Sequence, residues 1–118
     1  MNQRRFKPTS ASIGEVSSFL VSVRKALAEG SFVLIDRSKN LEAVARLGIT
    51  PKEEVRTLVY QDYDRGPLPD HDGNGFVWEF IKDLGDDELY VKLKMDSRGC
   101  VCISMHESDG PITLPYKE

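Results

Sequence analysis

The stretch that decides the fold is 89-LYVKLKMDSRGCVCISMH-106, in which two alternating segments flank a short turn signal. Apolar residues recur at every second position of each segment, and Ser97-Arg98-Gly99 supply the turn. Because strand side chains project alternately to the two faces, the pattern predicts a β-hairpin with one apolar face. In the second segment, Cys100 and Cys102 fall in the outward register. The residues expected to face the core are Val101, Ile103 and Met105.

The other face of this hairpin gathers groups that transfer protons or bind anions. It carries a phenol, two ammonium groups, a hydroxyl and an imidazole, from Tyr90, Lys92, Lys94, Ser104 and His106. The preceding strand, Phe76–Ile81, places Trp78 in the core register and adds Glu79 to the polar face. Neighbouring strands lie roughly 4.8 Å apart, so these groups can meet around one substrate atom. The competing interpretation is an ordinary solvated face, which antiparallel sheets commonly have.

Upstream, the sequence predicts helices and one short strand. Ser12-Ile13-Gly14-Glu15 has the form of a capping box and begins a helix that ends at Gly30. Proline and glycine interrupt residues 62–75 and predict an exposed loop. Gly110-Pro111 and Pro115 indicate that the last residues wrap the surface without regular pairing. The other expected elements are a strand at 32–35, a helix at 41–47 capped by Asn40, and a helix starting at a second capping box, 50–53.

This order of elements predicts an α+β fold. A short first strand and a C-terminal three-strand meander would form a mainly antiparallel sheet, with helices packed on one face. The chain has 118 residues, 40% of them apolar, which suits one domain. Residues 1–11 lack apolar periodicity and contain Pro8, so we expect a flexible basic tail followed by a single domain over 12–118.

Composition limits the classes of function. No apolar run approaches the roughly 18 residues of a membrane span, so we expect a cytoplasmic protein without a membrane partner. A net charge of -3 argues weakly against a nucleic-acid binder, which usually needs a basic surface. Two cysteines two positions apart and only two histidines give little support to a disulfide or a zinc site. We therefore expect no cofactor and no metal.

One loop keeps a metal hypothesis open. Asp70-His71-Asp72-Gly73-Asn74-Gly75 has a faint likeness to a calcium loop but lacks the closing glutamate of an EF-hand. A turn is the favoured interpretation. A metal-dependent hydrolase that uses His71 and the aspartates would lose its activity in EDTA.

Short motifs in the second half of the chain resemble a known family. The motifs are L-G-I-T-P at 47–51, D-Y-x-x-G-P at 62–67, V-W-E-F at 77–80, L-Y-V-K-L at 89–93, C-I-S-M-H at 102–106 and L-P-Y-K at 114–117. In this order and spacing they resemble the MqsR-type toxins of bacterial type II toxin–antitoxin systems, which share the RelE-like fold. The resemblance covers about residues 13–117.

The resemblance implies a metal-independent endoribonuclease, an mRNA interferase, that a cognate antitoxin neutralises. In such enzymes the 2′-hydroxyl of the mRNA attacks the adjacent phosphorus and leaves a 2′,3′-cyclic phosphate. Whether cleavage would require a ribosome is open. Position by position, the resemblance assigns catalysis to Tyr90, Lys92, Glu79 (some members have glutamine) and His106 (some have lysine). It assigns a basic loop group to Arg65, although Asp64 aligns almost as well; the other candidate RNA contacts are Lys82, Lys94 and Ser104.

The resulting hypothesis gives each group one task. Glu79 or Tyr90 assists removal of the 2′-hydroxyl proton, His106 protonates the 5′-oxygen, and Lys92 with Arg65 stabilises the phosphorane. The alternative is a non-catalytic protein-binding module on the same scaffold. The acidic balance of the chain and the carboxylate of Glu79, at a site that should tolerate phosphate, favour that alternative.

Overall fold

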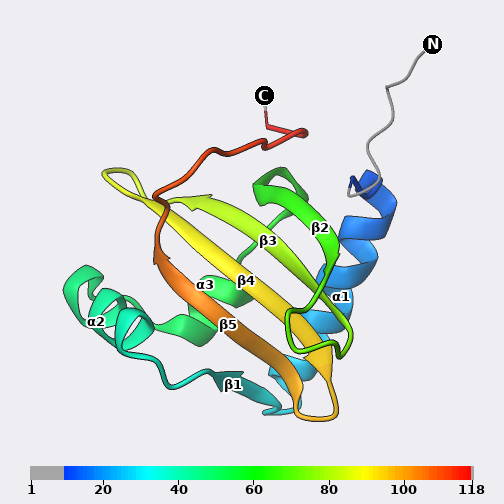
Figure 1. The fold of residues 1–118 in the computed structure, drawn as a ribbon, viewed down its shortest axis with the longest axis horizontal. Helices are drawn as coiled ribbons and strands as arrows, with labels where there is room; N and C mark the ends of the chain where they lie inside the picture. Colours follow the sequence, from blue (N-terminus) through cyan, green and yellow to red (C-terminus); the bar gives the residue numbers. More distant parts are fainter. Residues whose placement is uncertain (1–9, 118) are drawn as a thin grey trace.

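The computed structural model describes residues 10–117, which form three α-helices and a five-stranded mixed sheet (Figure 1). The sheet order is β1-β5-β4-β3-β2; β1 runs parallel to β5, and the other neighbours are antiparallel. The α+β class is therefore confirmed. The helices are α1 (Ile13–Ala28), α2 (Ser38–Leu47) and α3 (Pro51–Arg56), with a 3-10 turn, η1 (Tyr60–Asp62). The strands are β1 (Phe32–Leu34), β2 (Tyr63–Pro69), β3 (Phe76–Asp83), β4 (Glu88–Asp96) and β5 (Gly99–Glu107).

Strand β2 lies where the sequence predicted a loop over 62–75, so the first half of that prediction was wrong. It pairs antiparallel with β3 through two register shifts and forms one edge of the sheet. Tyr63 at its start is fully buried in the core. Pro67 and Pro69, which suggested a loop, are tolerated because an edge strand needs only one of its two sides for pairing.

Helix α1 covers one face of the sheet. The capping box is present, since Ser12 Oγ accepts from Glu15 N at 3.1 Å and Glu15 Oε1 accepts from Ser12 N at 2.8 Å. Figure 1 shows α1 passing behind the strands, and its buried residues join those of the sheet in one apolar cluster. Its members include Val16, Leu20, Val23, Phe80, Val91 and Met105. The opposite face of the sheet is left for polar side chains.

A β-bulge interrupts the hairpin that decides the fold. Lys92 pairs with Ser104, but the next pair is Leu93 with Cys102, so Ile103 is an extra residue in β5. Because of this extra residue, the side chains of β5 that precede Ile103 face the opposite sides of the sheet from those that the alternation predicted. The predicted register of 100–103 was therefore wrong: Cys100 and Cys102 belong to the core cluster, and Val101 does not. Beyond the bulge, Ser104 and His106 keep the polar face.

Burial has a chemical consequence for the two cysteines. It raises the pKa of the Cys100 thiol to about 12 and also raises the pKa of Cys102. Both cysteines are free and buried. They are therefore protonated, unreactive core residues at neutral pH.

Asn40 is not the predicted cap. Helix α2 begins at Ser38, and Asn40 lies inside it, fully buried, with its side chain against the edge of β5. Its Nδ2 donates to Ile35 O at 3.1 Å and to Ile103 O at 3.0 Å, and its Oδ1 accepts from Met105 N at 3.0 Å. Asn40 thus supplies hydrogen-bond partners to backbone groups of β5 beyond the end of β1, which has only three residues. At α3, Thr50 makes no capping hydrogen bond, although Pro51 does occupy the first turn.

The start of the described chain is anchored. Residues 1–9 of the predicted tail lie outside the described residues, but Ala11 is buried. Its N–H donates to Tyr63 Oη at 2.9 Å, and its carbonyl accepts from Tyr116 Oη at 2.6 Å. Within residues 10–117, no helix is long and apolar enough to cross a bilayer.

Candidate functional site

A pocket of 290 Å³ opens on the polar face of the sheet. Four neighbouring strands contribute to it. Glu79 on β3, Tyr90 on β4 and His106 on β5 alternate with core residues on their own strands, and β2 adds Asp64 and Arg65. Residues 108–111, which follow β5, form one wall of the pocket. The polar residues that line the pocket are Asp64, Arg65, Glu79, Tyr90, His106, Ser108 and Asp109.

Tyr90 and His106 face each other across the β4–β5 ladder. They are register partners, and their ring centroids lie 5.2 Å apart with a 39° tilt. His106 Nδ1 is 3.0 Å from its neighbour's carbonyl, Glu107 O. Because a carbonyl only accepts, Nδ1 carries a hydrogen in this arrangement. Nε2 is therefore the ring nitrogen that can exchange a proton with a ligand.

Tyr90 is held in its neutral form. Burial raises the pKa of its phenol, and the charge of Glu79 and a hydrogen bond to that carboxylate raise it further. A phenol with a raised pKa is a hydrogen-bond donor at neutral pH and a poor base. Of the two bases considered for the 2′-hydroxyl, Glu79 is thus the better one.

Glu79 and Arg65 form an ion pair at the pocket. They are register partners in β3 and β2, and Arg65 Nη2 and Nε lie 2.7 and 3.1 Å from Glu79 Oε1. Glu79 is 5% exposed, whereas the Arg65 side chain is half exposed. The pKa of Arg65 is raised by its hydrogen bond to Glu79. The guanidinium is thus placed at the rim, where it can contact both the pocket and solvent.

Lys92 and Ser104 lie beside the pocket without lining it. Lys92 is the register partner of both Glu79 and Ser104, so these three residues share the row of the polar face next to that of Tyr90 and His106. It is half-buried, and its ammonium makes no ion pair with any residue in the range 10–117. The ammonium of Lys92 therefore remains available to a ligand, whereas Ser104 is buried.

Lys94 and Lys82, predicted as RNA contacts, are engaged elsewhere. The buried ammonium of Lys94 donates to Asp70 Oδ2 at 2.6 Å and Asn74 O at 2.7 Å, which fastens the β2–β3 loop to β4. Lys82 lies inside β3 in the register of Phe80, and it binds Glu54 Oε1 at 2.8 Å and Thr57 Oγ1. That register faces the helices. Neither lysine lines the pocket, and their role as RNA contacts stays a prediction.

Replacing Lys94 by methionine is expected to loosen the β2–β3 loop, because the change keeps the stem and removes the ammonium. Amide exchange in residues 70–75, followed by mass spectrometry, should accelerate about tenfold. Lys92→Met is the matched control, since that lysine has no ion pair within residues 10–117. Equal exchange in the two variants would show that the ammonium does not hold the loop.

The same ion pairs bear on the metal hypothesis. Asp70 and Asp72 lie 2.6 and 3.6 Å from Lys94 Nζ, so the carboxylates of the calcium-like loop are ion-paired with a lysine. His71 is exposed. Across residues 10–117, no group of three histidine, cysteine or acidic side chains is arranged to hold a metal ion.

Two components of the pocket were not among the predicted site residues. Asp64 is buried, and its Oδ1 accepts from the backbone N–H groups of Thr113 and Leu114 at 2.5 and 3.0 Å. Residues 108–111 form one wall. The available signal was the motif at 62–67, in which Asp64 competed with Arg65 for one aligned position.

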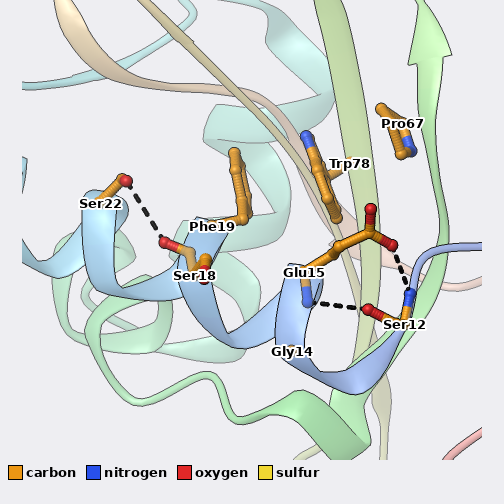
Figure 2. Close-up of a pocket in the computed structure, with 8 residues that line it drawn as sticks. All are labelled: Ser12, Gly14, Glu15, Ser18, Phe19, Ser22, Pro67 and Trp78. Carbon is orange, nitrogen blue, oxygen red and sulfur yellow. Dashed lines mark hydrogen bonds between the residues drawn. The ribbon is translucent and has the colours of Figure 1, made fainter.

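A second and larger hollow lies on the helix side, where α1 meets β2 and β3 (Figure 2). Figure 2 shows Phe19 stacked on Trp78, with centroids 4.4 Å apart, and Pro67 beyond the indole. Among residues 10–117, Glu15 is the only charged residue that lines this hollow, and hydrogen bonds from Ser12 lower the pKa of that carboxylate. The described residues around this hollow of 660 Å³ supply no pair of groups for acid–base chemistry, so we place the candidate site on the opposite face of the sheet.

The comparisons with family models, with curated proteins and with solved structures each found no match to the chain.

Proposed function

We propose that the chain is a metal-independent endoribonuclease that cleaves mRNA. One observation carries the proposal: a carboxylate, a phenol, a guanidinium and an imidazole converge on one pocket of the sheet. RNA supplies its own nucleophile, so the protein need only accept one proton, donate another and stabilise added negative charge. Glu79, His106 and Arg65 can perform these three tasks.

The proposed reaction is a transesterification within the RNA. Glu79 takes the proton from the 2′-hydroxyl, the 2′-oxygen bonds to phosphorus, and the phosphorus–5′-oxygen bond breaks. His106, charged at Nε2, gives its proton to the departing 5′-oxygen. Arg65 turns from Glu79 to the phosphorane, and Tyr90 donates a hydrogen bond to it; Lys92 adds positive charge from the next row.

The resemblance of the motifs to MqsR-type toxins supports this proposal and extends it to a RelE-like fold. On this resemblance we further propose that the chain is a cytoplasmic toxin. Its partners would be mRNA, a cognate antitoxin and, if cutting requires it, the ribosome. Five polar pocket residues fall within the resembling motifs. Glu79, Tyr90 and His106 stand at specified positions, and Asp64 and Arg65 stand at the two open positions of D-Y-x-x-G-P.

Incubation of the purified chain with a mixed-sequence RNA in EDTA tests the proposal. We expect cleavage at defined sites, with fragments that end in 2′,3′-cyclic phosphate and begin with 5′-hydroxyl, as mass spectrometry of the fragments would show. RNA that stays intact both alone and with added ribosomes, or cleavage that EDTA abolishes, would contradict a metal-independent ribonuclease.

A second candidate, a protein-binding module, is favoured by the charge of the pocket. Among the lining residues that the structure describes, Asp64, Glu79 and Asp109 contribute three carboxylates against the single guanidinium of Arg65. Such a pocket suits a lysine side chain of a partner better than a phosphate. If the chain leaves RNA intact but binds a lysine-containing peptide in calorimetry, and Glu79→Gln weakens that binding, the module is the better assignment.

A further inference from the structure

The last described residues form a strap over the candidate site. We define the C-terminal strap as residues 108–117; in Figure 1 it runs from the end of β5 toward β2 (red). Its near end is fixed where Ser108 N donates to Glu88 O at 2.7 Å. Its far end is fixed by Asp64 and by Tyr116, whose ring stacks on Tyr63 with centroids 5.9 Å apart.

Between these anchors the strap is weakly held. Residues 109–112 are exposed and make no backbone hydrogen bond to any residue described. Asp109 has one ion pair, with Lys39 at 3.5 Å, and both side chains are exposed. Segments with few hydrogen bonds and little buried surface open at low free-energy cost. The two N–H groups bound to Asp64 are thus a main link between the middle of the strap and the sheet.

The strap limits what the pocket can accept. Residues 108–111 supply one wall, and the enclosed 290 Å³ is near the lower limit for a small-molecule site. A phosphodiester with a nucleoside on each side needs more room. Asp109 also adds negative charge to a pocket that already contains Asp64 and Glu79. Release of the strap would therefore both widen the pocket and remove a charge that repels phosphate.

We propose that the C-terminal strap is an autoinhibitory lid, and that Asp64 is the catch that holds it closed through Thr113 and Leu114. The identity of the excluded ligand rests on the proposed function, because RNA is the ligand that the closed lid would exclude. The opening itself can be tested without RNA, because the pocket contains one of the two histidines of the chain.

Replacing Thr113 by proline removes the N–H that donates to Asp64 at 2.5 Å and leaves every pocket residue unchanged. Thr113→Ala is the matched control, because it keeps that N–H. Diethyl pyrocarbonate modifies accessible imidazoles, and exposed His71 is an internal reference for His106, which is 7% exposed. We expect the ratio of His106 to His71 modification, read by peptide mass spectrometry, to rise about tenfold in Thr113→Pro and to stay unchanged in Thr113→Ala.

An unchanged ratio in folded Thr113→Pro would overturn the lid. Should that variant fail to fold, Tyr116→Phe replaces it, since it removes only the hydroxyl that donates to Ala11 O. The ratio should then rise several-fold, and an unchanged ratio would again overturn the lid. Circular dichroism of each variant establishes that the fold is retained.

An RNA-cleavage assay of the same variants separates the two proposals. If Thr113→Pro cleaves faster than wild type and the histidine ratio rises, both proposals are supported. If the ratio rises and no variant cleaves RNA, the lid is supported and the ribonuclease is not. If wild type cleaves RNA and the ratio does not change, the ribonuclease is supported and the lid is overturned.

Discussion

Replacing His106 by alanine is expected to lower the rate of RNA cleavage by about 10²–10⁴-fold, the usual contribution of one positioned acid or base. Its Nδ1 is bound to Glu107 O, so Nε2 is the nitrogen that faces the reaction. Alanine removes the proton donor for the 5′-oxygen. Initial rates with a fluorogenic RNA substrate, at saturating and at limiting substrate, would show whether the loss falls on kcat, as a proton-transfer role requires.

His71→Ala is the matched control for this experiment, because His71 is exposed in the β2–β3 loop and is the only other histidine of the chain. Its activity should equal that of wild type. Imidazole added to His106→Ala should restore part of the rate, which a merely structural loss would not allow. Full activity in His106→Ala would remove His106 from the mechanism and leave Glu79 without a partner acid.

Replacing Asn40 by alanine is expected to lower the free energy of unfolding by about 2–4 kcal/mol. The N–H of Met105 would lose its acceptor in the interior, and the carbonyls of Ile35 and Ile103 would each lose one hydrogen bond and keep the one that they accept from Arg37. Each hydrogen bond lost by a carbonyl costs about 0.5–1.5 kcal/mol. A buried polar group without a partner costs about 1–3 kcal/mol. The better helix propensity of alanine returns only about 0.5 kcal/mol, so the loss dominates.

Urea denaturation followed by fluorescence of Trp78 would measure this change. Leu41→Ala is the matched control, since Leu41 is the next residue of α2 and is 48% exposed. The control should lose less than half as much stability. A loss below about 1 kcal/mol in Asn40→Ala would mean that water replaces the side chain at the edge of β5.

Local sequence patterns predicted those parts of the fold that depend on local physics. The capping box at Ser12 and Glu15 identified the start of α1, because both of its hydrogen bonds close within four residues. Alternation over residues 89–95 identified β4, which spans Glu88–Asp96 in the structure. It could not reveal the extra residue at Ile103, because a bulge depends on which residues of the neighbouring strand are paired.

The errors have the same physical origin. Asparagine is a common residue at helix starts, which is why the sequence predicted Asn40 as a cap. Its burial against β5 depends on the tertiary fold, which that preference does not reflect. Gly66 and Pro67 are typical of loops, yet pairing with β3 makes Tyr63–Pro69 a strand. Lys94 has the register of the polar face, but the carboxylates of the β2–β3 loop cover its ammonium.

The candidate site was predictable only in part, for similar reasons. The placement of Glu79, Tyr90 and His106 on one face follows from strand alternation, and the structure places all three in one pocket. Arg65 joins them through the unpredicted strand β2. The hydrogen bonds of Asp64 to Thr113 and Leu114 span about fifty residues and leave no periodic signal in the sequence.

The two outer strands of the sheet have a consequence for the behaviour of the protein at high concentration. Exposed strand edges are templates on which further copies of a chain can polymerise. Here one edge is β1, only three residues long, and the other is β2, where Pro67 and Pro69 have no hydrogen to donate. Both ends of the sheet therefore resist the stacking of copies into fibrils, even when many molecules crowd together.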